Sequence, residues 1–165
     1  MRTSVSHPLQ IAEVRVGECG GIGLTLCPGK KDSAAMTGGW DRDLALDLNA
    51  VRLWNAAAVV TLAEEKELNL LEVPQLGREV VRRHMSWFHL PIVDASTPDA
   101  YFEQAWKLHG ERLRSILRQG FNVLIHCRGG LGRAGTIAAR LLVELGVGPQ
   151  EAIQQVREVR PGGSA

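Results

Sequence analysis

The chain has 165 residues, of which 45% are hydrophobic, and its formal net charge is +1 at pH 7. This length fits one domain that buries its own core without disulfide or metal staples. The charge is close to zero and no long block of like charge occurs, which argues against a nucleic-acid partner and against a polybasic membrane tail.

The start of the chain, MRTSVSHPLQ, lacks the apolar core of a signal peptide, and no apolar run approaches the length of a membrane span. Three cysteines, Cys19, Cys27 and Cys127, stand at irregular spacing, which fits neither a disulfide framework nor paired zinc-ligand motifs. We therefore expect a cytoplasmic protein in a reducing compartment, without a membrane span. Four histidines also lack ligand spacing and are expected to be structural or superficial: His7, His84, His89 and His109.

The first third of the chain predicts a hairpin followed by a loop and a helix. Residues 11–16 (IAEVRV) and 22–26 (IGLTL) favour short strands, and the glycines between them favour a tight connection. Residues 28–39 predict a polar loop bounded by glycines. A helix is expected over 41–55 from the spacing of its apolar residues, with Asp41 as its cap.

The middle of the chain predicts two strands separated by a helix. Residues 57–62 (AAVVTL) have the length and β-branched character of a buried strand, and 85–93 (MSWFHLPIV) predict another. The helix between them is expected over 74–84, with Pro74 in its first turn. The segment 63–67 (AEEKE) is expected to be a solvated surface segment.

The last third predicts three helices and one strand. Thr97 and Pro98 are expected to cap and begin a long helix that Gly120 closes. A strand over FNVLIH, a helix over AGTIAARLLVELG and a helix starting at Pro149 follow. Because strands alternate with helices, we predict an α/β fold with a central, mostly parallel sheet flanked by helices, and ligand sites beyond the carboxyl ends of its strands.

The stretch HCRGGLGRAG, residues 126–135, stands at such a strand end. A glycine-rich loop between a strand and a helix can point successive N–H groups into one concavity that binds anions. The helix dipole adds positive potential, and Arg133 adds a planar fork that matches two phosphate oxygens. The same field favours the thiolate form of Cys127, so the loop predicts a nucleophile beneath a bound phosphate.

Displacement of an alkoxide or phenoxide from phosphorus also needs a proton donor. Asp94 and Asp99 follow the strand at 85–93, which we expect to lie beside the cysteine strand. Asp94 is the predicted acid, although a role as a turn residue is the alternative. Asp99 falls at a helix start, where the dipole alone accounts for a carboxylate.

The pattern of HC, five residues and then R resembles the signature of the cysteine-based protein tyrosine and dual-specificity phosphatases. The segments IGLTLCPGKK, LLEVPQL, LPIVDASTPD and IHCRGGLGR are similar, in order, to segments of the cyclin-dependent-kinase-associated phosphatase group. The resemblance implies a protein tyrosine phosphatase-like fold, hydrolysis of phosphotyrosine or phosphothreonine in proteins, and no metal or other cofactor.

The resemblance also implies the site residues. Cys127 is then the nucleophile, Arg133 the phosphate clamp and Asp94 the general acid and later base, while His126 supports the thiolate. The expected phosphate-binding residues, which would also hold phosphate-like anions, are Arg128, Gly129, Gly130, Leu131, Gly132 and Arg133. The whole chain, 1–165, is expected to be one phosphatase domain. Relatives continue beyond RPGGSA through a last helix, so the domain is either shortened here or ends naturally.

One departure and one extra cation leave other functions open. The family usually has Ser or Thr after the arginine, and here it is Ala134, so we predict slow turnover of the phosphocysteine unless Thr136 substitutes. A phosphate-binding module with impaired turnover is therefore one alternative. Arg128 favours substrates with extra negative charge, so a phosphoinositide or small-molecule phosphatase is another. Arsenate reductase or sulfurtransferase chemistry ranks last.

Overall fold

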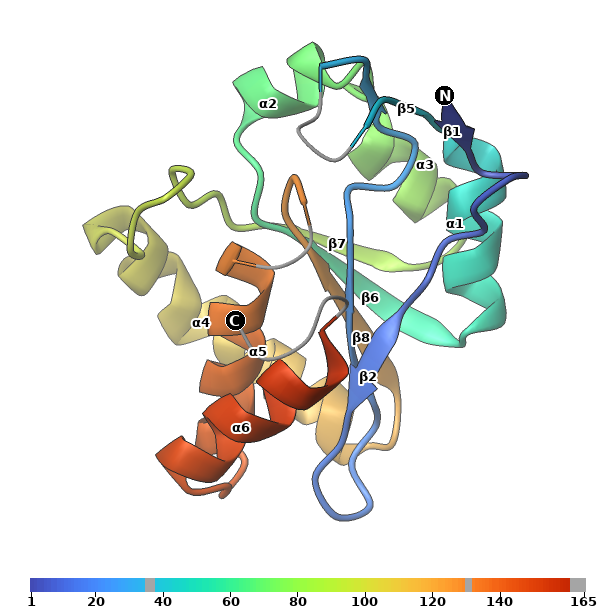
Figure 1. Cartoon of the computed structure of the whole chain (residues 1–165). Coiled ribbons are helices and arrows are strands. Elements are labelled where there is room, and N and C mark those ends of the chain that lie inside the picture. The colour runs from blue at the N-terminus through green and yellow to red at the C-terminus, as the bar shows by residue number, and fades with distance from the viewer. Residues whose placement is uncertain (35–37, 130–131, 161–165) are drawn as a thin grey trace.

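A five-stranded sheet forms the centre of the protein (Figure 1). A computed structural model of the chain describes residues 1–34, 38–129 and 132–160. In spatial order, the strands of the sheet are β2 (Ala12–Val14), β3 (Ile22–Thr25), β8 (Asn122–His126), β6 (Ala56–Thr61) and β7 (Ser86–His89). β3, β8, β6 and β7 run parallel, whereas β2 forms an antiparallel hairpin with β3. The predicted α/β class, parallel sheet and hairpin are thus confirmed.

Helices cover both faces of this sheet, as Figure 1 shows. The helices on one face include α1 (Leu44–Leu53) and α3 (Leu76–Arg82), and those on the other are α4 (Ala100–Arg118), α5 (Gly132–Glu144) and α6 (Pro149–Val159). The short helix α2 (Glu65–Leu70) follows β6. No helix within the three described ranges is long and apolar enough to cross a membrane.

The two central strands are apolar because both of their faces are covered. Val59 of β6 and Leu124 of β8 belong to the core beneath α1 and α3, while Val60 and Ile125 face α4, α5 and α6. Successive side chains of a strand point to opposite faces, and a strand buried on both faces therefore reads as a continuous apolar run. This is why the sequence pattern identified β6 and β8.

A second, smaller sheet was not predicted. It contains β1 (Arg2–Thr3), β5 (Trp40–Asp41) and β4 (Lys31–Asp32) in that order. β4 lies within the segment 28–39 that was expected to be a loop, β5 directly follows that segment, and β1 lies near the N-terminus. Two-residue strands carry no hydrophobic period, so only their pairing in the tertiary structure reveals them.

The helix starts differ from those predicted. Asp43, not Asp41, caps α1, and Asp99, not Thr97, caps α4; in each case the carboxylate accepts a hydrogen bond from the backbone N–H three residues later. Pro98 thus precedes α4. Several residues that can cap a helix lie within a few positions of each helix start, so the sequence pattern alone did not identify the cap.

Candidate active site

The cysteine loop connects β8 to α5 at the carboxyl end of the parallel strands. Cys127 directly follows β8 and is buried, and Arg133 is the second residue of α5. Two predicted phosphate-binding residues, Gly130 and Leu131, lie outside the described residues. A Cβ added to Gly129 or Gly132 would meet no described atom within 4 Å. Packing therefore does not account for these glycines, which agrees with a loop that a ligand approaches closely.

Arg133 is a buried cation that the protein holds in one orientation. Its guanidinium donates to both carboxylate oxygens of Glu67, at 2.7 and 2.8 Å, and to the carbonyl of Ile92 at 2.8 Å. Burial alone lowers the pKa of Arg133, but the hydrogen bonds to Glu67 and the nearby negative charges raise it above its ordinary value. The side chain is therefore a permanent, pre-oriented positive charge at the start of α5.

Glu67 is a site residue that the sequence analysis missed. It belongs to AEEKE, which was wrongly expected to be a solvated surface segment, and its side chain is only 7% exposed. It also accepts from the backbone N–H of Glu64 in a capping box at the start of α2. Burial raises the pKa of Glu67, but Arg133 and the backbone hydrogen bond lower it by more, so it stays ionised. The Glu64–Glu67 spacing was the available signal for this helix start.

The expected N-terminus of the next helix also needs correction. α3 begins at Leu76 after Gln75, so Pro74 precedes the helix rather than lying in its first turn. Residues 71–75 therefore connect α2 to α3. Glu67 of α2 contacts Arg133 of α5.

Asp94 lies close to Arg133, although the two residues belong to different segments. Its Oδ1 is 3.6 Å from Nη2 of Arg133 and accepts a hydrogen bond from the backbone N–H of Ala95. The side chain is 68% exposed, so its carboxyl remains accessible. We predicted that β7, the strand before Asp94, lies beside β8. This prediction is wrong, because β6 lies between the two strands. The long loop after β7 brings Asp94 close to Arg133, whereas Asp99 caps α4.

His126 ends β8 and is completely buried. Its Nδ1 lies 3.0 Å from the carbonyl oxygen of Cys127; a carbonyl only accepts, so Nδ1 carries the hydrogen and donates it. Burial lowers the pKa of His126 to about 4, against a smaller raising effect of that hydrogen bond. The ring is therefore neutral near pH 7, and it contacts Cys127 through the backbone carbonyl of that residue.

Arg128 forms an ion pair with a residue outside the cysteine loop. Its Nη2 lies 3.0 Å from Oδ2 of Asp32, whose side chain is 10% exposed, so the charge of Arg128 is balanced within the protein. Both residues line a cavity of about 400 Å³ together with Lys31 and Trp40. Trp40 thus lines a cleft beside the cysteine loop.

A second cavity, of about 290 Å³, lies between Asp94 and the start of α5. Arg133 and Thr136 line it. The Thr136 hydroxyl donates to the carbonyl of Gly132 at 3.2 Å, so it is engaged with its own helix. Ala134 is completely buried and contributes no hydroxyl. No group of three or more His, Cys, Asp or Glu side chains in the described ranges could hold a metal ion.

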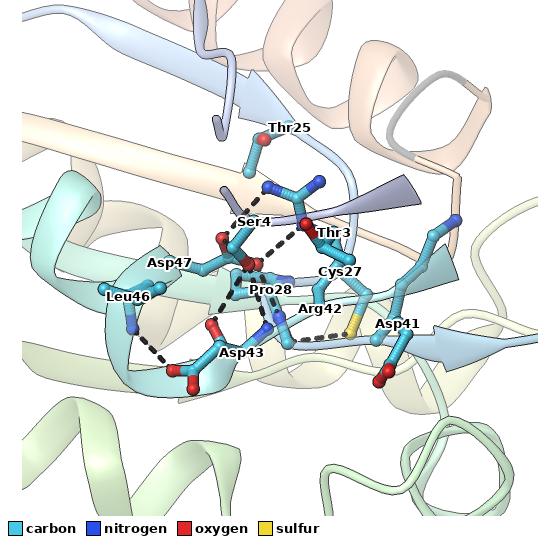
Figure 2. A network of polar contacts seen from close by, with 12 residues as sticks. Thr3, Ser4, Thr25, Cys27, Pro28, Asp41, Arg42, Asp43, Leu46 and Asp47 are labelled. Atoms are coloured by element: carbon cyan, nitrogen blue, oxygen red, sulfur yellow. Dashed lines mark hydrogen bonds and ion pairs between the residues drawn. The ribbon is translucent and has the colours of Figure 1, made fainter. Parts of the chain in front are cut away.

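A buried polar network around Asp47 joins helix α1 to Ser4 and Arg42 (Figure 2). Asp47 of α1 accepts two hydrogen bonds from Arg42, at 2.8 and 3.0 Å, one from Ser4 and one from the backbone of Gly29. Both side chains of the ion pair are 1% exposed.

The segment 27–30, which the network holds at Gly29, is hydrogen-bonded to the cysteine loop. The backbone N–H of Cys27 and the Nζ of Lys30 each lie 3.3 Å from the carbonyl oxygen of Arg128 and donate to it. The Asp47 network therefore holds this segment against the loop, and the sequence analysis did not foresee it.

Comparisons with known proteins agree with this geometry. The family model described as "Swiss Army Knife protein, DSP-PTPase phosphatase domain" matches residues 44–165. The chain therefore belongs to the DSP-PTPase phosphatase family.

Within this family, the chain is close to the kinase associated phosphatases. It is 32% identical over 145 residues to "Cyclin-dependent kinase inhibitor 3" of Rattus norvegicus, covering 87% of this chain and 65% of that protein. The structure matches a kinase associated phosphatase whose catalytic-site cysteine was substituted by serine, with a TM-score of 0.80, 27% identity, and coverage of 93% of this chain and 84% of that one. It also matches Tk-PTP in the active form, with a TM-score of 0.60, 31% identity, and coverage of 89% and 84%.

Proposed function

We propose that this chain is one phosphatase domain, spanning 1–165, that hydrolyses phosphomonoesters of tyrosine and of serine or threonine in proteins. It acts through a phosphocysteine and needs no metal. We also propose a cytoplasmic location, because all three cysteines are free and a thiolate nucleophile requires a reducing compartment.

The first chemical step transfers the phosphoryl group to the enzyme. The loop N–H groups, Arg128 to Gly132, and the Arg133 guanidinium hold the phosphate oxygens. The sulfur of Cys127 attacks phosphorus, so that an S–P bond forms as the P–O bond to the substrate breaks. Asp94 gives its proton to the leaving oxygen, which departs as the neutral alcohol or phenol.

The second step returns the enzyme to its starting state. Asp94, now a carboxylate, accepts a proton from a water molecule that attacks phosphorus. The P–S bond breaks, inorganic phosphate leaves and the thiolate of Cys127 is restored.

One observation carries this proposal: the clamp and the acid meet at the loop that Cys127 begins. Glu67 and the Ile92 carbonyl fix the guanidinium of Arg133, and the carboxyl of Asp94 lies 3.6 Å from it. A positioned cation and an accessible carboxyl beside a thiol supply the three groups that the reaction needs.

Two alternatives have different support. The pairing of Arg128 with Asp32 weakens the case for phosphoinositides, because the extra cation is already balanced. A phosphate-binding module with impaired turnover is the stronger alternative. Ala134 lacks the family hydroxyl, and the hydroxyl of Thr136 is occupied by Gly132.

The experiment is hydrolysis of para-nitrophenyl phosphate across pH in the presence of a metal chelator. Cys127→Ser is expected to abolish product release, and Asp94→Asn to lower it about 100-fold or more. Asp99→Asn is the matched control: it is the same chemical change in the same segment, and asparagine also caps helices, so its rate should equal that of the wild type.

The outcomes separate the alternatives. Steady turnover on phosphotyrosine and phosphothreonine peptides supports the proposal, and faster turnover of phosphoinositide vesicles than of either peptide contradicts it. A stoichiometric burst followed by near silence identifies the phosphate-binding module with impaired turnover. Full activity in Cys127→Ser would overturn the proposed nucleophile.

A further inference from the structure

Three side chains on neighbouring strands form a hydrogen-bonded series that ends at the cysteine loop. The indole Nε1 of Trp87 lies 2.8 Å from Oγ1 of Thr61, and that oxygen lies 2.7 Å from Nε2 of His126. The other ring nitrogen of His126 reaches the Cys127 carbonyl at 3.0 Å. Thr61 and His126 are completely buried and stand opposite each other where β6 and β8 end.

The direction of every hydrogen bond in this series follows from its two ends. The Cys127 carbonyl can only accept, so Nδ1 of His126 is the donor. A neutral imidazole has one N–H, so its Nε2 accepts, and the hydroxyl of Thr61 must donate to it. The indole N–H of Trp87 can only donate, and it reaches the Thr61 oxygen. The lowered pKa of His126, about 4, agrees with the neutral ring.

All three donors therefore point the same way, toward the backbone of Cys127. Hydrogen bonds in series polarise one another, so the Thr61 hydroxyl and the Nδ1–H of His126 become stronger donors because each group also accepts a hydrogen bond. Burial adds to the effect, because no water competes and an unsatisfied Nε2 would be costly.

We propose that Thr61 and Trp87 are positioning residues of the cysteine loop. They orient and polarise His126, and His126 in turn fixes the Cys127 peptide at the start of this loop. In this series, Thr61 and Trp87 are connected to the Cys127 backbone through His126. The proposal rests on the proposed function for its consequence in catalysis, but the series itself can be tested without any substrate.

The test uses the full chain and four variants. Thr61→Val removes the hydroxyl with little change of shape, and Thr61→Ser restores it. Trp87→Phe removes the N–H at the far end of the series, together with part of the indole ring. Trp54→Phe is the matched control, because Trp54 is also part-buried and its N–H also forms a 2.8 Å hydrogen bond, but to Glu13 rather than to the series.

The first readout is the exchange of the His126 Nδ1 proton with water, followed by NMR with nitrogen-15 in the histidine rings. We expect this exchange to be about three- to tenfold faster in Thr61→Val, faster by a smaller factor in Trp87→Phe, and unchanged in Thr61→Ser. The second readout is the rate at which iodoacetamide alkylates Cys127 at pH 7, quantified on the peptide that contains Cys127. We expect this rate to be lowest in Thr61→Val, reduced by a smaller factor in Trp87→Phe, and unchanged in Thr61→Ser.

The outcomes are distinct from those of the phosphatase assay. The predicted order of variants in both readouts supports the series even if no substrate is hydrolysed. Exchange and alkylation in Thr61→Val equal to the wild type would overturn it, and so would equal changes in Trp87→Phe and Trp54→Phe. If Thr61→Val does not fold, the comparison of the two tryptophan variants decides the question.

Discussion

Replacement of Glu67 by glutamine is expected to remove the partner that holds Arg133. The carboxylate accepts from both terminal nitrogens of the guanidinium, and the two side chains are only 7% and 5% exposed. Glutamine keeps one acceptor oxygen but presents an NH₂ group to the second guanidinium nitrogen. One of the two bonds is then replaced by two donors that face each other.

The magnitude follows from the burial of this pair. Removal of one partner of a buried ion pair costs about 3–5 kcal/mol, because the remaining charge is left uncompensated. The retained oxygen places Glu67→Gln near the lower end, at about 3 kcal/mol. For a domain of this size, such a loss lowers the midpoint of thermal unfolding by roughly 6–12 °C.

The assay is urea denaturation of wild type and variant at several pH values. The folded-state pKa of Glu67 lies below its ordinary value, so its ionised form stabilises the fold above the unfolded pKa of about 4.3. This contribution disappears as pH falls through the lower folded pKa. The difference in the free energy of unfolding between variant and wild type should therefore be largest near pH 7 and decrease below about pH 4.

A control on the same helix tests whether the ion pair is the cause. Glu65→Gln changes an exposed carboxylate of α2 and should alter the free energy of unfolding by less than about 0.5 kcal/mol. If Glu67→Gln is as mild as Glu65→Gln, or if its cost is the same at pH 3 as at pH 7, the reasoning from the buried pair is refuted.

Three further predictions concern other parts of the site. Asp47→Ala leaves Arg42 charged and buried and should cost about 3–5 kcal/mol in chemical denaturation; a loss below about 1 kcal/mol would contradict the role of the network. Ala134→Ser should accelerate hydrolysis of the phosphocysteine, seen as a smaller burst and faster steady release, and an unchanged time course would argue against it. Because the pKa of His126 is lowered to about 4 on folding, the free energy of unfolding should fall as pH drops from about 6.5 toward 4, a slope that His126→Asn should reduce.

Local patterns were sufficient to predict much of the fold and part of the site. The buried strands β6 and β8 are short apolar runs, and the hairpin of β2 and β3 has glycines between its strands. The cysteine loop was recognisable because its residues are consecutive. A strand, a glycine-rich turn and the arginine of the next helix all depend on neighbours within about ten positions, where periodicity and turn chemistry act.

Contacts between distant segments were decided only by the tertiary structure. Glu67 and Arg133 are 66 positions apart, so no local pattern predicts that Glu67 is the partner of Arg133. Arg128 forms an ion pair with Asp32 across 96 positions, a contact that no local pattern predicts.

The strand order has the same origin. β6 rather than β7 lies beside β8, and the predicted acid reaches the site through its loop instead of through an adjacent strand. The sequence by itself thus determined which groups can do chemistry, because that depends on residue type and local spacing. The tertiary structure determined which charges are balanced and which remain available, because that depends on burial and on partners that only folding brings together.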